Sequence, residues 1–313
     1  MSAPAHALIL TAGLGTRLQP LTSVRAKPAI PVAGEPLVRR IIRSLVAEGV
    51  RNITLNLHHR PETLAAVVGD GSDLGARVRY SWELPQILGS AGGPRQALDI
   101  IGADAFLLVN GDTLADVDVR ALWRAHMASD ALVTLALVPN AEPLRYGGVR
   151  LADDGAYARP EPRGPAAVGS FHFVGVQAVR RGAFLDIPHG AAAASIGGVY
   201  ERLAAERPGA VRGFVTGARF WDIGTVADYL RTNAALADSS APVHTSGTSV
   251  SGSASVTRSI LWDEVTVGAH AILDECIVTD RVHVPAGAHH HRAILIQGAD
   301  GQIEATPLDA ERP

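Results

Sequence analysis

The sequence has little cysteine, no long apolar run and little net charge, and each shortage excludes a class of protein. Cys276 is the one cysteine, so no disulfide can form within the chain, as is typical of a reducing compartment. No apolar run approaches the ~20 residues that span a bilayer. A formal net charge of −3 provides no broad basic field for nucleic acid or membrane. We therefore expect a cytoplasmic protein without a nucleic-acid or membrane partner.

The shortage of lysine singles out one position. Lys27 is the one lysine, whereas 27 basic residues are arginine. Arginine replaces lysine at most surface sites, so the exception is expected where a compact ammonium on a flexible stem is needed. Chance survival of one lysine is the alternative. Because Lys27 lies in the most motif-like stretch of the chain, we take it as a candidate catalytic residue.

Apolar runs alternate with helical spacing from the start of the chain. Strands are expected at 6–12, 52–57, 78–82 and 105–110, and helices at 36–48, 61–68 and 93–101. Further strands are expected at 131–138, 168–179 and 211–216, and helices at about 195–206 and 226–237. The alternation predicts an α/β fold with a doubly wound, mostly parallel, Rossmann-like sheet that binds ligands beyond the carboxyl ends of its strands. We expect this domain to span residues 1–240, with a substrate-binding lobe at about 139–220.

From about residue 241 the composition changes, and a short repeat begins. The stretch Val265-Thr266-Val267-Gly268-Ala269 recurs as Val282-His283-Val284-Pro285-Ala286, so that Val265 corresponds to Val282. This spacing predicts stacked coils of a parallel β-helix over 241–313, with a β-meander as the alternative. So few coils are not expected to cover their own apolar stripe, so we expect a contact with the main domain or a homo-oligomer. The tail also contains three consecutive histidines, His289–His291. Neighbouring residues of a strand point to opposite faces, so the three side chains are not expected to bind one metal ion.

The first strand leads into a glycine-containing loop. Backbone N–H groups in such a loop can approach phosphate closely. The residues of the loop that we expect at the nucleotide are Leu10, Ala12, Gly13, Gly15 and Thr16. Arg17 adds a planar fork that fits phosphate, and Lys27 adds a point charge. The stretch lacks the G-x-G-x-x-G spacing of dinucleotide binders and the Gly-Lys-Ser/Thr ending of P-loops, which excludes both.

Two aspartates follow strand-like segments. Asp112 comes after Gly111 at the end of a buried strand, a position suited to hold Mg²⁺ against a nucleotide. Taken alone, Asn110-Gly111-Asp112 is more often an ordinary turn. Asp222 precedes Gly224-Thr225 at the start of a helix, and its local alternative is a helix cap.

Residues 10–34 resemble the signature of the sugar-1-phosphate nucleotidyltransferases, Ala-Gly-x-Gly-Thr-Arg-Leu-x-Pro-Leu-Thr followed by Lys-Pro. The resemblance implies that Arg17 and Lys27 contact a nucleoside triphosphate and stabilise the transition state. It also implies that Gly111 belongs to the nucleotide site and that Asp112 and Asp222 hold Mg²⁺. The 241–313 tail resembles the left-handed β-helical extensions of some members.

Two further segments extend the resemblance. Glu83, Leu88 and Gly89 match the segment that lines the base and ribose, with at least one extra residue between Glu83 and Gly89. Residues 145–149 and 159–163 match the sugar 1-phosphate subsite, which implies Tyr146, Gly147, Gly148, Glu161 and Arg163 as ligands. Relatives carry Glu-Lys-Pro where this chain reads Arg159-Pro160-Glu161-Pro162-Arg163, so Arg159 or Arg163 replaces the usual lysine.

The resemblance implies transfer of a nucleotidyl group from a nucleoside triphosphate to a sugar 1-phosphate. Two alternatives remain: a regulatory homologue that binds NDP-sugar, and an enzyme of the same fold with a non-sugar acceptor. The presence of Arg17, Lys27, Asp112 and Asp222 speaks against the first. None of the motifs lies beyond residue 225, so the tail is not expected to serve the chemistry.

Overall fold

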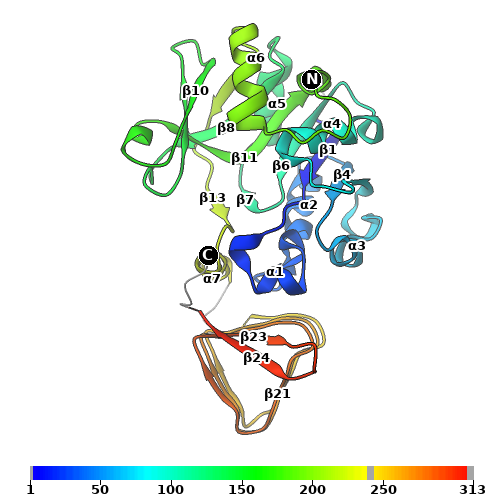
Figure 1. Cartoon of the computed structure of the whole chain (residues 1–313), viewed down its shortest axis with the longest axis vertical. Coiled ribbons are helices and arrows are strands. Elements are labelled where there is room, and N and C mark those ends of the chain that lie inside the picture. Colours follow the sequence, from blue (N-terminus) through cyan, green and yellow to red (C-terminus); the bar gives the residue numbers. More distant parts are fainter. Residues whose placement is uncertain (1–2, 238–242, 309–313) are drawn as a thin grey trace. The chain divides into compact units, whose positions relative to one another are not determined.

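The computed structural model describes residues 3–237 and 243–308 (Figure 1). The described chain forms two compact units. One holds the residues up to Gly13 together with Val38–Trp221, and the other holds Leu14–Leu37 and the residues from Asp222 onward. The contacts therefore group the segment that follows Gly13 with the C-terminal part of the chain. No helix of the described ranges is long and apolar enough to cross a membrane.

A nine-stranded mixed sheet forms the centre of the first unit. Its main path runs β10 (Tyr157–Glu161), β9 (Gly148–Leu151), β11 (Phe171–Arg180), β6 (Ala105–Asn110), β1 (His6–Leu10), β4 (Asn52–Leu57), β5 (Arg77–Trp82). Strands β6, β1, β4 and β5 are parallel, whereas β11 is antiparallel to β6. Beside β11 lie β8 (Val133–Pro139) and then β12 (Val211–Val215). The predicted α/β fold with a mostly parallel sheet is confirmed.

Helices connect and cover these strands. They are α2 (Leu37–Ala47), α3 (Pro61–Val68), α4 (Gly89–Ile101), α5 (Val119–Met127) and α6 (Tyr200–Glu206). Short helical turns lie at η3 (Ser72–Leu74), η4 (Pro165–Ala167), η5 (Arg181–Ala183) and η6 (Ser195–Val199). Helix α4 packs against β1, β4 and β5, and α5 packs against β8 and β11. One face of α2 is apolar and buried, with Ile41, Ile42 and Leu45 at most 3% exposed.

Two helix starts differ from the expectation. Helix α4 begins at Gly89 rather than near residue 93, because the N–H groups of Ala91 and Gly92 bond to the carbonyl of Ala193. This tertiary contact supports a glycine-rich turn that would be weak in isolation. Helix α6 begins at Tyr200 rather than near 195, since the backbone of Ile196 and Gly197 is not helical.

The second unit begins with the loop that carries the signature. It contains η1 (Thr16–Leu18), α1 (Leu21–Val24), η2 (Lys27–Ala29) and the paired strands β2 (Pro31–Val32) and β3 (Glu35–Pro36). The same unit includes α7 (Val226–Leu236), which starts with a capping box between Thr225 and Asp228. The segment and α7 are joined, because Tyr229 OH donates to the carbonyl of Pro31 at 2.7 Å.

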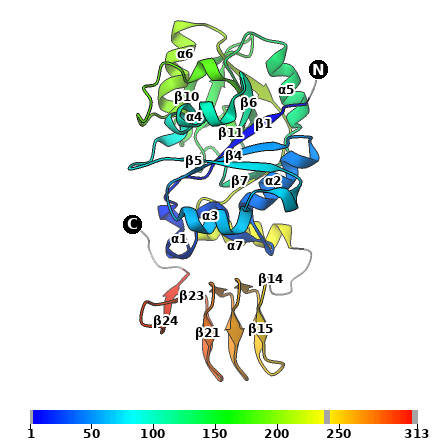
Figure 2. The same cartoon turned by 90° about the vertical axis from the view of Figure 1, so that its right-hand side faces the viewer.

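The tail forms three parallel sheets in which each strand pairs with its counterpart in the next repeat. One holds β14 (Val243–His244), β17 (Ile260–Leu261), β20 (Ile277–Val278) and β23 (Ala293–Gln297), with β24 (Ile303–Pro307) antiparallel at its edge. The others hold β15 (Ser249–Val250), β18 (Thr266–Val267) and β21 (His283–Val284), and β16 (Ser255–Thr257), β19 (Ile272–Asp274) and β22 (His289–His291). Figure 1 looks along the coils, which outline a triangle, and Figure 2 shows them stacked. The predicted β-helix is confirmed.

The apolar stripe is buried mainly within the tail itself, whereas the expected contact with the main domain is present, through Arg25 and Tyr229. Val265, Val267, Val282 and Val284 lie in a core of the tail's own side chains and are at most 4% exposed. The three sheets close around this core, so the coils cover these residues without a partner. One outward row is also covered. Ile260 and Ile277, each next in sequence to a core residue, point to the opposite face and are at most 4% exposed.

Candidate functional site

In the first unit, the predicted nucleotide residues gather at the carboxyl edge of the parallel strands. Leu10 at the end of β1 pairs with Asn110 at the end of β6. The segments that follow, Thr11–Gly13 and Gly111–Asp112, therefore leave the sheet side by side. This is the edge at which open α/β sheets bind ligands.

A buried hydrogen-bond network fixes this edge. Asn56 Oδ1 accepts from the N–H of Thr11 at 2.6 Å, and the Thr11 hydroxyl donates to the Asn56 carbonyl. Asn56 Nδ2 donates to Oε1 of Glu83 at 2.6 Å, and Glu83 Oε2 accepts from the N–H of Leu88 at 2.6 Å. Glu83 is fully buried, so its carboxylate orients the loop around Leu88 and Gly89 rather than facing solvent. Asn56 is a member of this site that the motifs did not indicate.

Gly111 allows β6 to leave the sheet close to β1. Its N–H donates to the carbonyl of Leu10 at 2.9 Å. A Cβ at this position would lie 2.4 Å from that same carbonyl oxygen, well inside van der Waals contact. A side chain at Gly111 would therefore displace the segment that carries Asp112.

In the second unit, Arg17 and Asp222 converge around Gly224. A Cβ on Gly224 would lie 3.1 Å from Asp222 Oδ2 and 3.5 Å from Arg17 Nη1. Arg17 follows Thr16 in η1, and its side chain is exposed. The structure thus places an arginine and an aspartate from distant parts of the sequence beside the same glycine.

Lys27 lies against the turn at Gly15. Gly15 has a left-handed backbone with φ of 64°, and the Thr22 hydroxyl donates to its carbonyl at 3.1 Å. A Cβ on Gly15 would lie 2.7 Å from Thr22 Cγ2 and 3.2 Å from Lys27 Cβ. Lys27 is 8% exposed. The close approach at Gly15 therefore sets where the lysine stem leaves the backbone.

The two predicted metal ligands belong to different units, Asp112 to the first and Asp222 to the second. Both offer carboxylate oxygens, the hard ligands that Mg²⁺ prefers. Within the described ranges, no group of three or more His, Cys, Asp or Glu side chains is placed to hold a metal ion.

The predicted sugar lobe holds an aromatic cluster. The ring of Tyr146 lies 4.4 Å from that of His172 and 5.6 Å from that of Phe220, measured between centroids. The Arg145 guanidinium carbon lies 4.7 Å from the centre of the Tyr146 ring. Burial lowers the pKa of His172 below its usual value, which favours the neutral ring. Of these three rings, the motif predicted Tyr146 alone as a ligand, because His172 and Phe220 come from distant segments of the sequence.

The remaining sugar-site candidates lie on β9, β10 and the loops that flank them. Gly148 opens β9 and pairs with Glu161 at the end of β10, and a Cβ on Gly147 would lie 2.9 Å from the Glu161 carbonyl oxygen. Glu161 is paired with Arg150 at 3.2 Å and with Arg159 at 3.0 Å. Arg163 follows and is exposed. Of the two arginines proposed to replace the family lysine, Arg159 pairs with Glu161 here.

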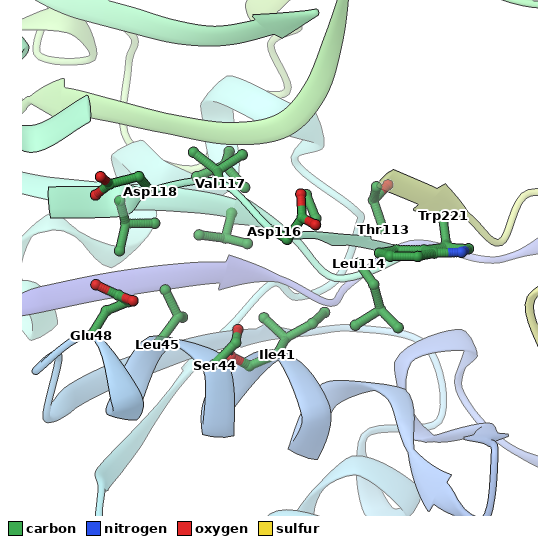
Figure 3. Close-up of a pocket in the computed structure, with 14 residues that line it drawn as sticks. Ile41, Ser44, Leu45, Glu48, Thr113, Leu114, Asp116, Val117, Asp118 and Trp221 are labelled. Atoms are coloured by element: carbon green, nitrogen blue, oxygen red, sulfur yellow. The ribbon is translucent and has the colours of Figure 1, made fainter. Parts of the chain in front are cut away.

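A separate cavity of about 480 Å³ lies in the first unit between α2 and the segment after β6. Figure 3 shows Ser44 and Leu45 of α2 and Glu48, which follows that helix, on one side and Asp116 and Asp118 on the other. Trp221 of β13 (Phe220–Asp222) and Thr113 of β7 (Thr113–Ala115) also line it. None of the predicted site residues lines this cavity.

Comparison with known families gives two matches. The family described as "Nucleotidyl transferase" matches residues 6–239. The family described as "GlmU-like, C-terminal hexapeptide" matches residues 231–300. Together the two matches cover both the sheet and the β-helical tail.

Among curated proteins, a mannose-1-phosphate guanylyltransferase of Mycobacterium tuberculosis is 28% identical over 90% of this chain and 81% of its own length. An N-acetylmuramate alpha-1-phosphate uridylyltransferase of Neisseria meningitidis is 36% identical over 50% of this chain and 69% of its own length. Among solved structures, HddC from Yersinia pseudotuberculosis complexed with GMP-PN has a TM-score of 0.63 at 25% identity. That match covers 74% of this chain and 99% of the other.

Proposed function

This chain belongs to the nucleotidyl transferase family, and from that premise we propose that it transfers a nucleotidyl group to a sugar 1-phosphate. The products are an NDP-sugar and pyrophosphate. The family match covers the signature loop and the sheet, and relatives named above are guanylyl- and uridylyltransferases of sugar 1-phosphates. The observation that carries the proposal is the single lysine, Lys27, buried beside the turn at Gly15 in the loop that also bears Arg17.

The chemistry requires no protein nucleophile. A sugar-phosphate oxygen, already ionised at neutral pH, attacks the α-phosphorus of the triphosphate. A new P–O bond forms, and the bond from the α-phosphorus to the bridging oxygen breaks, so that pyrophosphate leaves with its electron pair. Arg17 and Lys27 offer fixed positive charge to the phosphates as negative charge shifts toward the leaving group. The loop from Leu10 to Thr16 orients the triphosphate through its backbone.

Magnesium is the proposed cofactor. Asp112 and Asp222 would hold it together with phosphate oxygens and water, since two carboxylates alone make a weak magnesium site. When bound, the ion supplies positive charge next to the phosphates. The loops after β1 and β6 support this role, because they leave the sheet side by side and carry Gly13 and Asp112.

The acceptor is proposed to bind in the lobe of the first unit. The Tyr146 and His172 rings offer an apolar surface of the kind on which sugar rings pack, and Glu161 accepts hydrogen bonds from hydroxyls. Glu161 is flanked by Arg150 and Arg159, so positive charge is available there for the sugar phosphate. Arg163 is exposed on the loop that follows β10.

The test is a screen of pyrophosphate release. Each of the five common nucleoside triphosphates is paired with a panel of sugar 1-phosphates, starting with GTP and UTP and with mannose, glucose and N-acetylmuramic acid 1-phosphates. One pair is expected to release pyrophosphate and the matching NDP-sugar in equal amounts. The Lys27→Ala variant is the control for contaminating activity. Pyrophosphate release that does not depend on a sugar phosphate, or that persists in that variant, would contradict the proposal.

A further inference from the structure

The side chain of Arg25, two residues before Lys27, places its guanidinium group between two aspartates of the β-helical tail. Its Nε and Nη2 donate to the two oxygens of Asp280 at 2.6 and 2.7 Å. Nη2 also donates to Asp263 at 2.5 Å. The Arg25 side chain is 8% exposed, so it is surrounded by protein rather than water. The two-pronged contact to Asp280 fixes both the position and the plane of the guanidinium.

A second link reaches the other side of Lys27. Trp262 Nε1 donates to Tyr229 OH at 3.0 Å, and that hydroxyl donates to the carbonyl of Pro31. Trp262 and Tyr229 are both fully buried. The Arg25 guanidinium carbon lies 5.5 Å from the centre of the Trp262 ring, so the two links also touch each other. Lys27 therefore lies between two backbone positions that are tied to the tail and to α7.

The residues that make these links depart from the repeat of the tail. Equivalent positions of successive repeats stack on one another in adjacent coils. Asp263 and Asp280 occupy a row whose other members are Ser246 and Gln297. Trp262 occupies a row whose other members are Thr245, Thr279 and Ile296. The other coils close without an acid or a tryptophan at these positions. In the structure, Asp263 and Asp280 bond to Arg25, and Trp262 bonds to Tyr229.

Arg25 is basic and close to the phosphate loop, but its surroundings argue against a phosphate contact. Its donors are directed to Asp263, to Asp280 and, from Nη1 at 3.4 Å, to the carbonyl of Ala29. Two carboxylates offset its single positive charge. A guanidinium held in this way cannot turn to a triphosphate without taking the cationic partner from Asp280, whose side chain is only 13% exposed, which is costly.

We propose that the tail positions the catalytic lysine. Asp263 and Asp280 hold Arg25, and Arg25 holds the backbone from which Lys27 extends. Arg25 is a positioning residue, and the tail is part of the catalytic apparatus rather than an appendage. This replaces the expectation that the tail has no duty near the chemistry. The inference rests on the proposed function for the role of Lys27 in transfer, but the placement of Lys27 can be tested without substrate.

The single lysine provides the test. Full-length protein grown with ¹³Cε-lysine has one lysine signal, that of Lys27. The test variants are Arg25→Gln, which removes the charged fork and adds no second lysine, the single Asp280→Asn, and the double Asp263→Asn/Asp280→Asn. The matched control is Asp274→Asn, which removes a tail carboxylate that pairs instead with Arg258 at 2.6 Å. Melting curves establish that each variant is folded, and Arg25→Gln and Asp280→Asn are the variants used if the double variant does not fold.

In the test variants we expect the Lys27 signal to move or broaden and kcat to fall by about 10- to 100-fold, the effect of a small misplacement of a catalytic group. The control is expected to match wild type in both. Folded test variants with an unchanged Lys27 signal would overturn the inference, whether or not kcat falls. If the wild type transfers no nucleotide to any sugar phosphate, the proposed function fails, whereas the Lys27 signal still decides the positioning.

Discussion

Asn56 donates a 2.6 Å hydrogen bond to Glu83 across the carboxyl ends of two neighbouring parallel strands, β4 and β5. The pair lies in a chain of contacts from the backbone of Thr11 to the backbone of Leu88. It thus connects the end of β1 to the start of α4, the two segments predicted to line the nucleotide. A single buried carboxylate, fully enclosed by protein, orients both.

We expect Glu83→Gln to destabilise the protein by about 1–3 kcal/mol. The Glu83 carboxylate accepts hydrogen bonds from Asn56 and from the N–H of Leu88, and the glutamine NH₂ group would face one of these donors instead of accepting from it. The Michaelis constant for the nucleoside triphosphate should rise as the loop around Leu88 loosens. Urea unfolding and steady-state kinetics measure the two effects. Glu62→Gln is the control, since the Glu62 side chain is 65% exposed and its arginine partner is 3.8 Å away. Equal unfolding midpoints for the two variants would contradict the prediction.

Lys27→Arg should lower kcat by about 100-fold or more although charge is kept, because a planar guanidinium cannot occupy the enclosed position of a flexible ammonium stem. Lys27 is 8% exposed and packs beside Gly15, which leaves little room for a larger head group. Turnover and melting temperature are measured together. Arg124→Lys, at an exposed position of α5, is the control for the exchange itself. Turnover of the Lys27 variant within about threefold of wild type would refute the prediction.

Asp112 and Asp222 should bind Mg²⁺ appreciably only when nucleotide is present, since two carboxylates supply few of the six ligands that magnesium takes. Calorimetry is expected to show little heat of binding with the protein alone and clear binding with the NDP-sugar product. The double variant Asp112→Asn/Asp222→Asn should lose the nucleotide-dependent binding. Tight magnesium binding to the protein alone that survives both substitutions would show that the ion is held elsewhere.

The sequence predicted the elements that carry strong local patterns. A continuous apolar run located β1, the alternation of strand-like and helical segments located β4 and β6, and the recurrence in the tail located its stacked strands. Helix α5 was not predicted, although Asp118 caps it and Val119, Leu122, Trp123 and His126 follow at helical spacing. That pattern was sufficient to find it.

Contacts between distant segments could not be predicted in the same way. The ring partners of Tyr146 are His172 of β11 and Phe220 of β13, and no periodicity relates the three positions. The links from Arg25 to the tail join positions that are 238 and 255 residues apart in the sequence. The repeat aligned each coil with the next, but it carried no information on which face of the coil meets the rest of the chain. Local spacing specifies elements, whereas the site depends on which elements the fold brings together.

The last prediction concerns acid stability and rests on His126, which is fully buried in α5. Its Nδ1 lies 2.8 Å from the Thr134 hydroxyl, and within the described ranges its Nε2 has no hydrogen-bond partner. Burial, and then the positive charge of Arg180, lower the pKa of His126 to about 4. In the unfolded chain the same ring titrates near 6.5. Between these values the unfolded state binds a proton that the folded state does not, so the free energy of unfolding decreases as the pH falls.

The His126 contribution is fully present above pH 6.5 and is lost progressively toward pH 4, by about 1.4 kcal/mol per pH unit. The His126→Phe variant removes this titration, and it also leaves the Thr134 hydroxyl without its partner at every pH. We therefore expect the variant to be less stable than wild type at pH 7 and to close much of that difference by pH 4.5. Urea unfolding of both proteins at half-unit steps of pH measures the difference directly, so that other titrating groups cancel. A difference in unfolding free energy that stays constant across this range would show that His126 does not titrate as its burial requires.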